Sequence, residues 1–324
     1  MEKRILIPNT DLSVYPIGLG AAGAGRHYDG ADTDRLFATY MDLGGNLIDT
    51  AHVYSNWIPG ERNRSERAIG DWFARTGKRH EIILMTKGGH HEVDRTSPLF
   101  RKRRLKREDM IEDVNGSLQK LRTDYIDIYF YHRDDTDLPV EYEIETMEQF
   151  VKEGKIRYYA CSNWDADRMV SAANYCKEKV YRGFIADQSL LNIGMKYMKE
   201  MADTTLRTTS GDAYQFHIDH PEVMEMPFSS NCNGFFQRYL TEGAEAVADS
   251  DYYTEKNLLV AQRIKALTEK YNCTVTQAVT GFFYFQPFQC IPLYGTSSPA
   301  HVKDVCSTLE IPFCAEDYRD ILTV

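Results

Sequence analysis

Four side chains that could carry acid–base chemistry follow three consecutive β-rich segments of the sequence. Asp49 lies near the end of NLIDTA, and Tyr54 comes five residues after it. Lys87 ends EIILMTK, and His132 ends IDIYFYH. Each residue is uninformative by itself, but the residues that end neighbouring parallel strands meet at one edge of a sheet. We therefore expect these four residues, called the tetrad below, to converge.

The tetrad combines an acid with groups that tune it. An unperturbed phenol has a pKa of roughly 10, too high for efficient proton transfer near neutrality. A nearby ammonium favours the phenolate, so we expect Lys87 to lower the pKa of Tyr54. Asp49 would keep Lys87 charged, and His132 would donate a hydrogen bond to a substrate carbonyl. The set predicts a site that protonates an oxygen while another group delivers two electrons to carbon.

Short apolar segments alternate with stretches of helical periodicity along the chain. Eight such units predict an α/β fold, a (β/α)8 TIM barrel that occupies residues 1–324 as a single domain. Catalytic groups of such barrels stand at the C-terminal ends of the strands, where the tetrad falls. The expected strands are residues 15–20, 46–51, 81–87, 126–132, 156–163, 183–192, 223–230 and 290–298.

Three segments lie outside this alternation. Residues 4–14 predict a β-hairpin that plugs the N-terminal end of the barrel. Residues 194–221, after the sixth strand, are polar and lack clear periodicity, which predicts a long functional loop or flap. Residues 235–256, after the seventh strand, form a second long loop before two helices expected at 257–271 and 275–285.

Composition excludes several classes of protein. The chain has 38 Lys and Arg against 48 Asp and Glu, a net charge of −10, so nucleic acid is not an expected partner. No stretch approaches the roughly 18 apolar residues of a membrane span, and the start lacks a secretory segment. We expect a cytoplasmic chain. Its seven cysteines are scattered without a C-x-x-C pair, which predicts reduced thiols.

A glycine motif offers a rival fold. Gly18, Gly20 and Gly23 match G-x-G-x-x-G after a strand, and an acid, Asp49, follows the second strand, as in a Rossmann dinucleotide site. In that motif the helix begins inside the glycine turn and holds the pyrophosphate. Here the sequence continues as loop for about ten more residues, and the strand count fits a barrel better. We therefore favour the barrel.

The tetrad and its neighbouring segments resemble the aldo-keto reductases, of the bacterial-type, soluble carbonyl reductase branch. The resemblance rests on DTAHVY, on the lysine of LMTK and on the histidine of FYHRDD. It continues through GLGAAG (18–23), SNW (162–164), DQ (187–188), PFSS (227–230) and IPLYGTSSPAHVKD (291–304), and so spans nearly the whole chain. It implies NAD(P)H-dependent reduction of an aldehyde or ketone, or the reverse alcohol oxidation, with hydride passing from nicotinamide C4 to the carbonyl carbon. Tyr54 would be the proton donor.

The resemblance also implies a nicotinamide cofactor bound in extended form across the barrel rim. Ser162, Asn163 and Gln188 correspond to the hydrogen-bonding partners of its carboxamide, and Phe228 takes the position of the aromatic ring that stacks on nicotinamide. A helix N-terminus after the eighth strand would offer backbone donors to phosphate. The remaining expected cofactor residues are Gly20, Ala21, Ala22, Ser229, Ser230, Gly295, Thr296, Ser297, His301 and Asp304.

Departures from the family at the adenosine end bear on the choice of nucleotide. Many members place Lys and Arg near the eighth strand to hold the 2′-phosphate of NADP, whereas this chain has Gly295 and His301. The family's Glu-Asn pair for adenine becomes Asp304 and Val305. Hydroxyls and one imidazole are a thinner donor set for a phosphate. Family frequency favours NADP(H) slightly, with NAD(H) as the alternative.

The substrate end of the site is expected to hold Trp57, His90, Arg133 and Trp164. Charged groups mixed with aromatic rings suit a hydroxylated small molecule better than a purely apolar one. The expected substrate is therefore a sugar-like or polyol-related carbonyl compound or alcohol. Whether the chain is a monomer or a homo-oligomer stays open at this point.

Two other functions are weighed against the reductase. A cofactor-binding regulatory or sensor subunit with little turnover would use the long polar segments to dock onto a partner. A metal-dependent barrel hydrolase would need a ligand set. His90 with His91, and His217 with His220, lack a nearby carboxylate or cysteine at ligand spacing, so we expect no metal.

Overall fold

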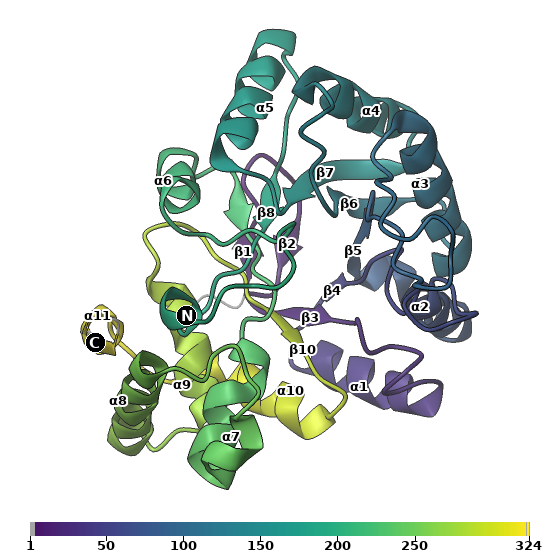
Figure 1. Cartoon of the computed structure of the whole chain (residues 1–324). Coiled ribbons are helices and arrows are strands. Elements are labelled where there is room, and N and C mark those ends of the chain that lie inside the picture. The colour runs from purple at the N-terminus through teal and green to yellow at the C-terminus, as the bar shows by residue number, and fades with distance from the viewer. Residues whose placement is uncertain (1–3, 322, 324) are drawn as a thin grey trace.

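The computed structural model describes residues 4–321 and residue 323. Within these residues, eight parallel strands form one curved sheet in the order β10-β3-β4-β5-β6-β7-β8-β9, with helices around it (Figure 1). In chain order the strands are β3 (Gly18–Gly20), β4 (Leu47–Asp49), β5 (Ile83–Gly88), β6 (Ile126–Tyr131), β7 (Ile156–Ser162), β8 (Ala186–Gln188), β9 (Met224–Glu225) and β10 (Leu293–Gly295).

Backbone hydrogen bonds close this sheet between β9 and β10. The amide of Ile291 donates to the carbonyl oxygen of Glu225 at 2.8 Å, and the amide of Leu293 donates to that of Pro227 at 3.1 Å. A closed sheet has no unpaired edge, and its strands are covered on both sides. The predicted (β/α)8 barrel is confirmed, and the Rossmann alternative is excluded.

Helices ring the strands and cover their outer side (Figure 1). None of the helices in the described residues is long and apolar enough to cross a membrane. Their bounds are α1 (Ala31–Asp42), α2 (Arg64–Thr76), α3 (Arg107–Leu121), α4 (Val140–Lys152), α5 (Ala166–Lys179), α6 (Asp212–Asp219), α7 (Phe235–Glu242), α8 (Glu255–Tyr271), α9 (Val275–Gly281), α10 (Pro299–Cys306) and α11 (Ala315–Ile321).

The inward-facing side chains of the strands form one apolar cluster with the N-terminal hairpin. The hairpin pairs β1 (Ile5–Leu6) with β2 (Ser13–Val14) in antiparallel fashion. Its buried residues Ile7, Leu12 and Val14 belong to the same cluster as side chains from β4 to β10. The hairpin therefore plugs the barrel as predicted, because apolar side chains at the open end of a barrel need a cover.

The two long segments contain more helix than the sequence predicts. Residues 194–221 were expected as loop, but they include a 3₁₀ turn (Met195–Tyr197) and α6. Residues 235–256 begin with α7 and continue with a second 3₁₀ turn (Ala244–Val247). α6 spans only about two turns and shows no clear apolar periodicity. α7, in contrast, has an apolar face at helical spacing that the sequence-based prediction missed, formed by Phe235, Phe236, Tyr239 and Leu240. Packing against the barrel, rather than local pattern, decides that α6 forms.

Candidate functional site

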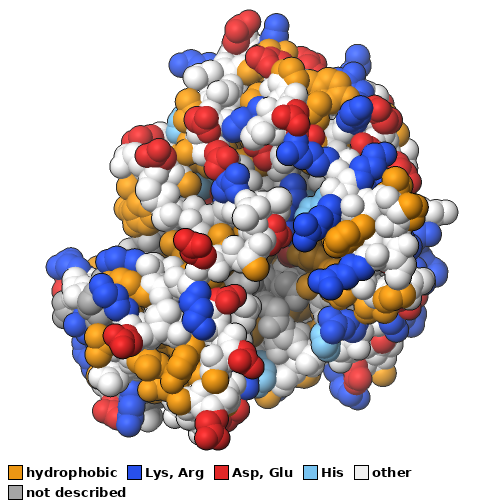
Figure 2. Space-filling model, in the orientation of Figure 1, with side chains coloured by type: hydrophobic (Ala, Val, Ile, Leu, Met, Phe, Trp, Pro, Cys, Tyr) orange, Lys and Arg blue, Asp and Glu red, His pale blue; other side chains and the backbone are white. Residues whose placement is uncertain are grey.

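The expected site residues gather at the C-terminal ends of the barrel strands. Gly20, Asp49, Ser162, Gln188 and Gly295 are the last residues of their strands. They line one cavity of about 640 Å³ together with the side chains of the tetrad. In the orientation of Figure 1, the space-filling view shows a hollow near the centre of this face (Figure 2). The strand ends thus bring residues far apart in the chain around one space.

A buried ammonium lies at the centre of the tetrad. Lys87 Nζ donates to both carboxylate oxygens of Asp49 at 2.7 Å and to the carbonyl oxygen of Thr50 at 2.7 Å. It also donates to Tyr54 Oη at 3.3 Å. The ammonium is thus held on one side by a carboxylate and on the other by the phenol.

Burial sets the acidity of this pair. Burial raises the pKa of Tyr54 and the Lys87 ammonium lowers it, but the net pKa lies above the usual value of 10.0. The net lowering expected from the sequence is therefore wrong in this structure, because the phenol is desolvated as well as paired. Burial lowers the pKa of Lys87, but Asp49 and Tyr54 raise it by more than burial lowers it. The net pKa of Lys87 therefore also lies above its usual value. Tyr54 is a protonated phenol and Lys87 a charged ammonium at neutral pH.

His132 contacts the ring of Tyr54 in the cavity lining. The two rings meet edge to face with their centroids 5.8 Å apart. Burial, together with the neighbouring His90 and Arg133, lowers the pKa of His132 well below 6.5. Its Nδ1 is buried without a hydrogen-bond partner among the described residues. His132 is therefore a neutral imidazole with hydrogen-bonding capacity left for a bound molecule.

Three polar residues of the cavity lining, Ser162, Asn163 and Gln188, are connected by hydrogen bonds. Gln188 Nε2 donates to Asp49 Oδ1 at 3.0 Å, and Ser162 Oγ donates to the backbone carbonyl oxygen of Gln188 at 2.7 Å. Asn163 Nδ2 donates to Ser162 Oγ at 2.9 Å. Asn163 has φ 61°, a left-handed conformation that asparagine tolerates well. These contacts fix the three side chains before any ligand binds.

Residues 203–209, called the strap below, close one side of the cavity. The amide of Arg207 donates to Asn163 Oδ1 at 2.9 Å, and the amide of Leu190 donates to the Arg207 carbonyl at 2.9 Å. The amide of Thr209 donates back to the Leu190 carbonyl at 3.0 Å. Leu206 lines the cavity. Part of the long segment after β8 therefore belongs to the site.

The other expected cofactor residues divide into two groups. Ala22, Phe228, Ser229, Thr296 and Ser297 line the cavity. Ala21 and Ser230 lie behind that lining, where the amide of Ala21 and the hydroxyl of Ser230 donate to backbone carbonyl groups. His301 Nδ1 is 3.3 Å from Thr296 Oγ1 at the start of α10. Asp304 accepts hydrogen bonds from Thr274, outside the cavity lining.

Of the four expected substrate residues, only Arg133 lines the cavity of the tetrad. Arg133 lines the cavity, and its guanidinium donates to Thr205 Oγ1 of the strap at 2.9 Å. His90 meets His132 edge to face at 4.7 Å between centroids and lines a neighbouring cavity of about 360 Å³. The Trp164 ring is fully buried in the apolar cluster between β7 and its helices, and Trp57 is 42% exposed. Neither tryptophan lines the cavity of the tetrad.

Several cavity residues were not predicted from the sequence. Asn231, Asn233 and Gly234 form a turn after β9, and this turn contains left-handed residues including Asn233 at φ 53°. The run SSNCNG is rich in residues that adopt this conformation, which is the signal that could have revealed the turn. The further residues that line the cavity without having been expected are Gly23, His27, Tyr28, Leu206 and Leu293.

Comparison with known proteins identifies the family of this chain. Residues 16–324 match the model of the aldo/keto reductase family. The chain is 26% identical to the aldo-keto reductase YhdN of Bacillus subtilis over 98% of this chain and 92% of the relative. It is 23% identical to an aryl-alcohol dehydrogenase of Pestalotiopsis microspora over 99% and 81%. It is 28% identical to norsolorinic acid reductase B of Dothistroma septosporum over 60% and 51%. Because its barrel and nearly its full length match, this chain belongs to the aldo/keto reductase family, whose enzymes are oxidoreductases that act on carbonyl compounds with nicotinamide cofactors.

Proposed function

We propose that this chain reduces an aldehyde or ketone with NAD(P)H, and that Tyr54 gives the proton to the carbonyl oxygen. The observation that carries the proposal is the position of Lys87 Nζ, which contacts both Asp49 and Tyr54 in a cavity at the barrel rim. A protonated phenol, a charged ammonium and a neutral imidazole together are equipped to stabilise charge that develops on an oxygen.

The cavity lining fits a nicotinamide cofactor. The hydroxyl and amides of Ser162, Asn163 and Gln188 match a carboxamide, which has both donors and acceptors. The Phe228 ring offers an apolar face for stacking. The turn Gly295–Ser297 before α10 would hold the phosphates, because amides at a helix N-terminus favour anions.

Each tetrad residue has a separate part in the proposed reaction. When bound, a nicotinamide cofactor would supply the hydride for the carbonyl carbon. Tyr54 Oη gives its proton to the carbonyl oxygen, and the resulting phenolate is stabilised by Lys87 Nζ until solvent returns a proton. Asp49 holds Lys87 charged and in place. The neutral imidazole of His132 donates a hydrogen bond that orients the carbonyl.

Replacing the phenol tests the proton donor. Tyr54→Phe removes the acidic proton and keeps the ring, so we expect kcat for carbonyl reduction to fall by roughly 10²–10⁴-fold. The affinity for NADPH, measured by nucleotide fluorescence, should not change. Tyr181→Phe is the matched control, because its hydroxyl contacts Glu145 far from the tetrad.

Retained turnover in Tyr54→Phe would show that another group is the acid. Tight cofactor binding with negligible turnover of every carbonyl by the unmodified chain would instead favour the regulatory or sensor subunit considered above.

The pH dependence follows from the two buried groups. Reduction needs a protonated Tyr54 and a neutral His132, and burial raises the pKa of Tyr54 above 10.0 and lowers that of His132 below 6.5. Neither group changes its protonation state between about pH 6.5 and 9, so kcat for reduction should be flat there. Alcohol oxidation needs the phenolate, so its rate should rise with pH across the same interval. If kcat for reduction changed with pH as one group titrated inside this interval, the protonation states assigned to Tyr54 and His132 would be wrong. The decay of the nucleotide in acid is measured without enzyme and subtracted as the blank.

We propose NADPH as the preferred nucleotide, with His301 as a contact for its 2′-phosphate. His301 is exposed on α10, beside the cavity residue Thr296. His301→Ala should weaken NADPH binding several-fold and leave NADH binding unchanged, because NADH lacks the phosphate. His80→Ala, in the turn before β5, is the control. Equal weakening for both nucleotides would contradict this contact.

We propose a sugar-like or polyol-related carbonyl compound as the substrate class. Arg133 and several amide and hydroxyl groups line the cavity beside His132, and such groups recognise hydroxyls through hydrogen bonds. Both proposed tryptophan contacts lie outside this lining, so polar groups make up more of the substrate end than the sequence suggested.

Two aldehydes of equal carbon number test this class. Glyceraldehyde carries hydroxyls where propanal has only hydrogen, so we expect kcat/KM to be at least about tenfold higher for glyceraldehyde, the equivalent of one or two net hydrogen bonds. Steady-state rates at saturating NADPH give the ratio. A preference for propanal, or for long-chain apolar ketones, would overturn the assignment.

A further inference from the structure

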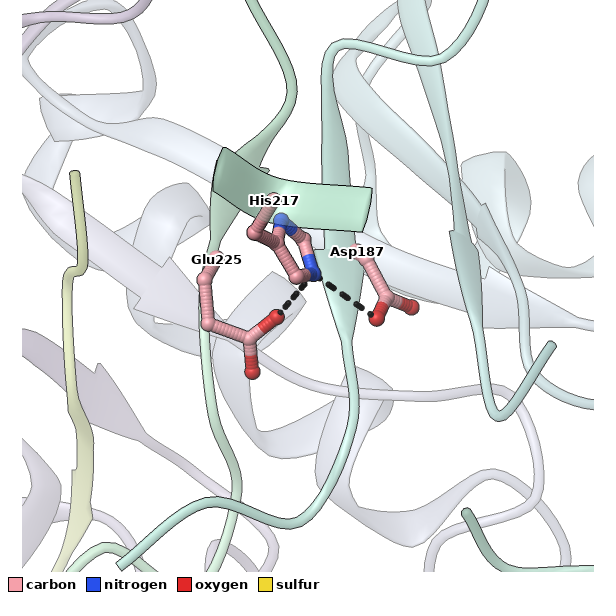
Figure 3. Close-up of side chains that lie close together, drawn as sticks. All are labelled: Asp187, His217 and Glu225. Atoms are coloured by element: carbon pink, nitrogen blue, oxygen red, sulfur yellow. Dashed lines mark ion pairs between the residues drawn. The ribbon is translucent and has the colours of Figure 1, made fainter. Parts of the chain in front are cut away.

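A cluster of three ionisable side chains lies buried outside the catalytic cavity (Figure 3). Asp187 comes from β8, Glu225 from β9 and His217 from α6. His217 Nε2 is 2.8 Å from Glu225 Oε2 and 3.5 Å from Asp187 Oδ2. All three side chains have 0% exposure. The sequence showed no carboxylate at ligand spacing from His217, because both carboxylates come from neighbouring strands.

The cluster carries an excess of negative charge. Among residues 4–321, the ion pairs of Asp187 and Glu225 within 4.0 Å are with His217 alone, and neither has a lysine or arginine partner. With both carboxylates ionised, one imidazolium leaves one negative charge uncompensated, which is costly away from water. Burial accordingly raises the pKa of Glu225 to about 7. A divalent cation with a neutral imidazole would make the group neutral.

The orientation of the imidazole leaves Nε2 facing the carboxylates. Nδ1 lies 3.3 Å from the carbonyl oxygen of Val223, which can only accept a hydrogen bond, so Nδ1 carries a proton. Nε2 and Glu225 Oε2 are close, yet neither has a hydrogen bond of acceptable geometry. Burial lowers the pKa of His217, but Glu225 and Asp187 raise it to about 10, so without an ion Nε2 also carries a proton. A cation bound by the same atoms would replace that proton.

The distances suit a metal ion. Zinc binds imidazole nitrogen and carboxylate oxygen at about 2.1 Å, and two ligands at that distance subtend about 84° when 2.8 Å apart and about 113° when 3.5 Å apart. Both angles lie in the range of tetrahedral and distorted sites. One nitrogen with two carboxylates is a ligand set for a divalent transition cation.

Neighbouring groups support the three side chains as they do around bound metals. The Nδ1 contact with a backbone carbonyl is the usual outer partner of a ligating histidine. Thr209 Oγ1 donates to Glu225 Oε1 at 3.0 Å, and Ser189 Oγ donates to Asp187 Oδ2 at 2.7 Å. Such partners fix the ligands before an ion binds.

We propose that Asp187, His217 and Glu225 bind a structural divalent transition cation, with Zn²⁺ as the ion that the ligand set fits best. Full burial leaves no route for a substrate, so the ion would connect α6 with β8 and β9. Asp187 precedes Gln188, and Glu225 holds Thr209 at the end of the strap. The ion would therefore brace two parts of the cavity wall without touching the reacting atoms.

Metal content of the purified chain tests the site. The full-length protein, without a histidine tag and grown with zinc and manganese, is passed through metal-free buffer and analysed by mass spectrometry of elements. We expect about one equivalent of zinc per chain, and less than about a tenth in Glu225→Gln and His217→Gln, because each loses a ligand charge or a ligand nitrogen. His220→Gln is the matched control: this histidine is paired with Glu222 and should keep the ion.

Refolding gives a second measurement that does not depend on the variants being soluble. The unmodified chain is refolded from urea with ZnCl₂ or with chelator, and we expect a higher Tm with zinc. One equivalent of another divalent transition metal supports the site and changes the ion. A chain without metal after purification and after refolding with zinc, or full metal content in Glu225→Gln, would overturn the proposal and leave a protonated His217 between the carboxylates.

Discussion

The buried ammonium of Lys87 is the contact on which the rest of the site depends. It satisfies the Asp49 carboxylate and reaches the Tyr54 hydroxyl, so three groups that would be unstable alone become stable together. Removing any one of them would leave a buried charge or a desolvated phenol without its partner. The same contact couples structure to chemistry, because the ammonium that balances a carboxylate in the resting protein would stabilise a phenolate during the proposed reaction.

The arrangement of the barrel strands brings Lys87 to Asp49. Asp49 ends β4, Lys87 lies one residue before the end of β5, and Gln188 ends β8 on the other side of the opening. Parallel strands deliver their last residues to one rim, so distant parts of the chain need only the correct strand order to meet. The strap and the turn after β9 then cover the rim and decide its shape, which is where members of one fold differ in substrate.

Adjacent residues of β8 serve two different environments. Gln188 reaches Asp49 in the cavity, whereas its neighbour Asp187 faces His217 of α6 on the outer side. Successive side chains of a strand point to opposite faces of the sheet. Asp187 and Gln188 therefore connect the buried cluster of His217 with the lining of the cavity. That cluster also holds Thr209 through Glu225, so the support of the strap comes from outside the cavity.

The sequence by itself determined the strand order, the plugging hairpin and the convergence of the tetrad, because periodicity and turn residues act between neighbours along the chain. Tertiary structure decided the properties that depend on burial and on contacts between segments far apart in the chain. Burial reversed the expected shift of the Tyr54 pKa and placed the ring of Trp164 in the apolar core. Packing formed α6 where the local pattern was weak. Only the closed barrel brought Asp187 and Glu225 to His217, since contact between strands does not depend on spacing in the sequence.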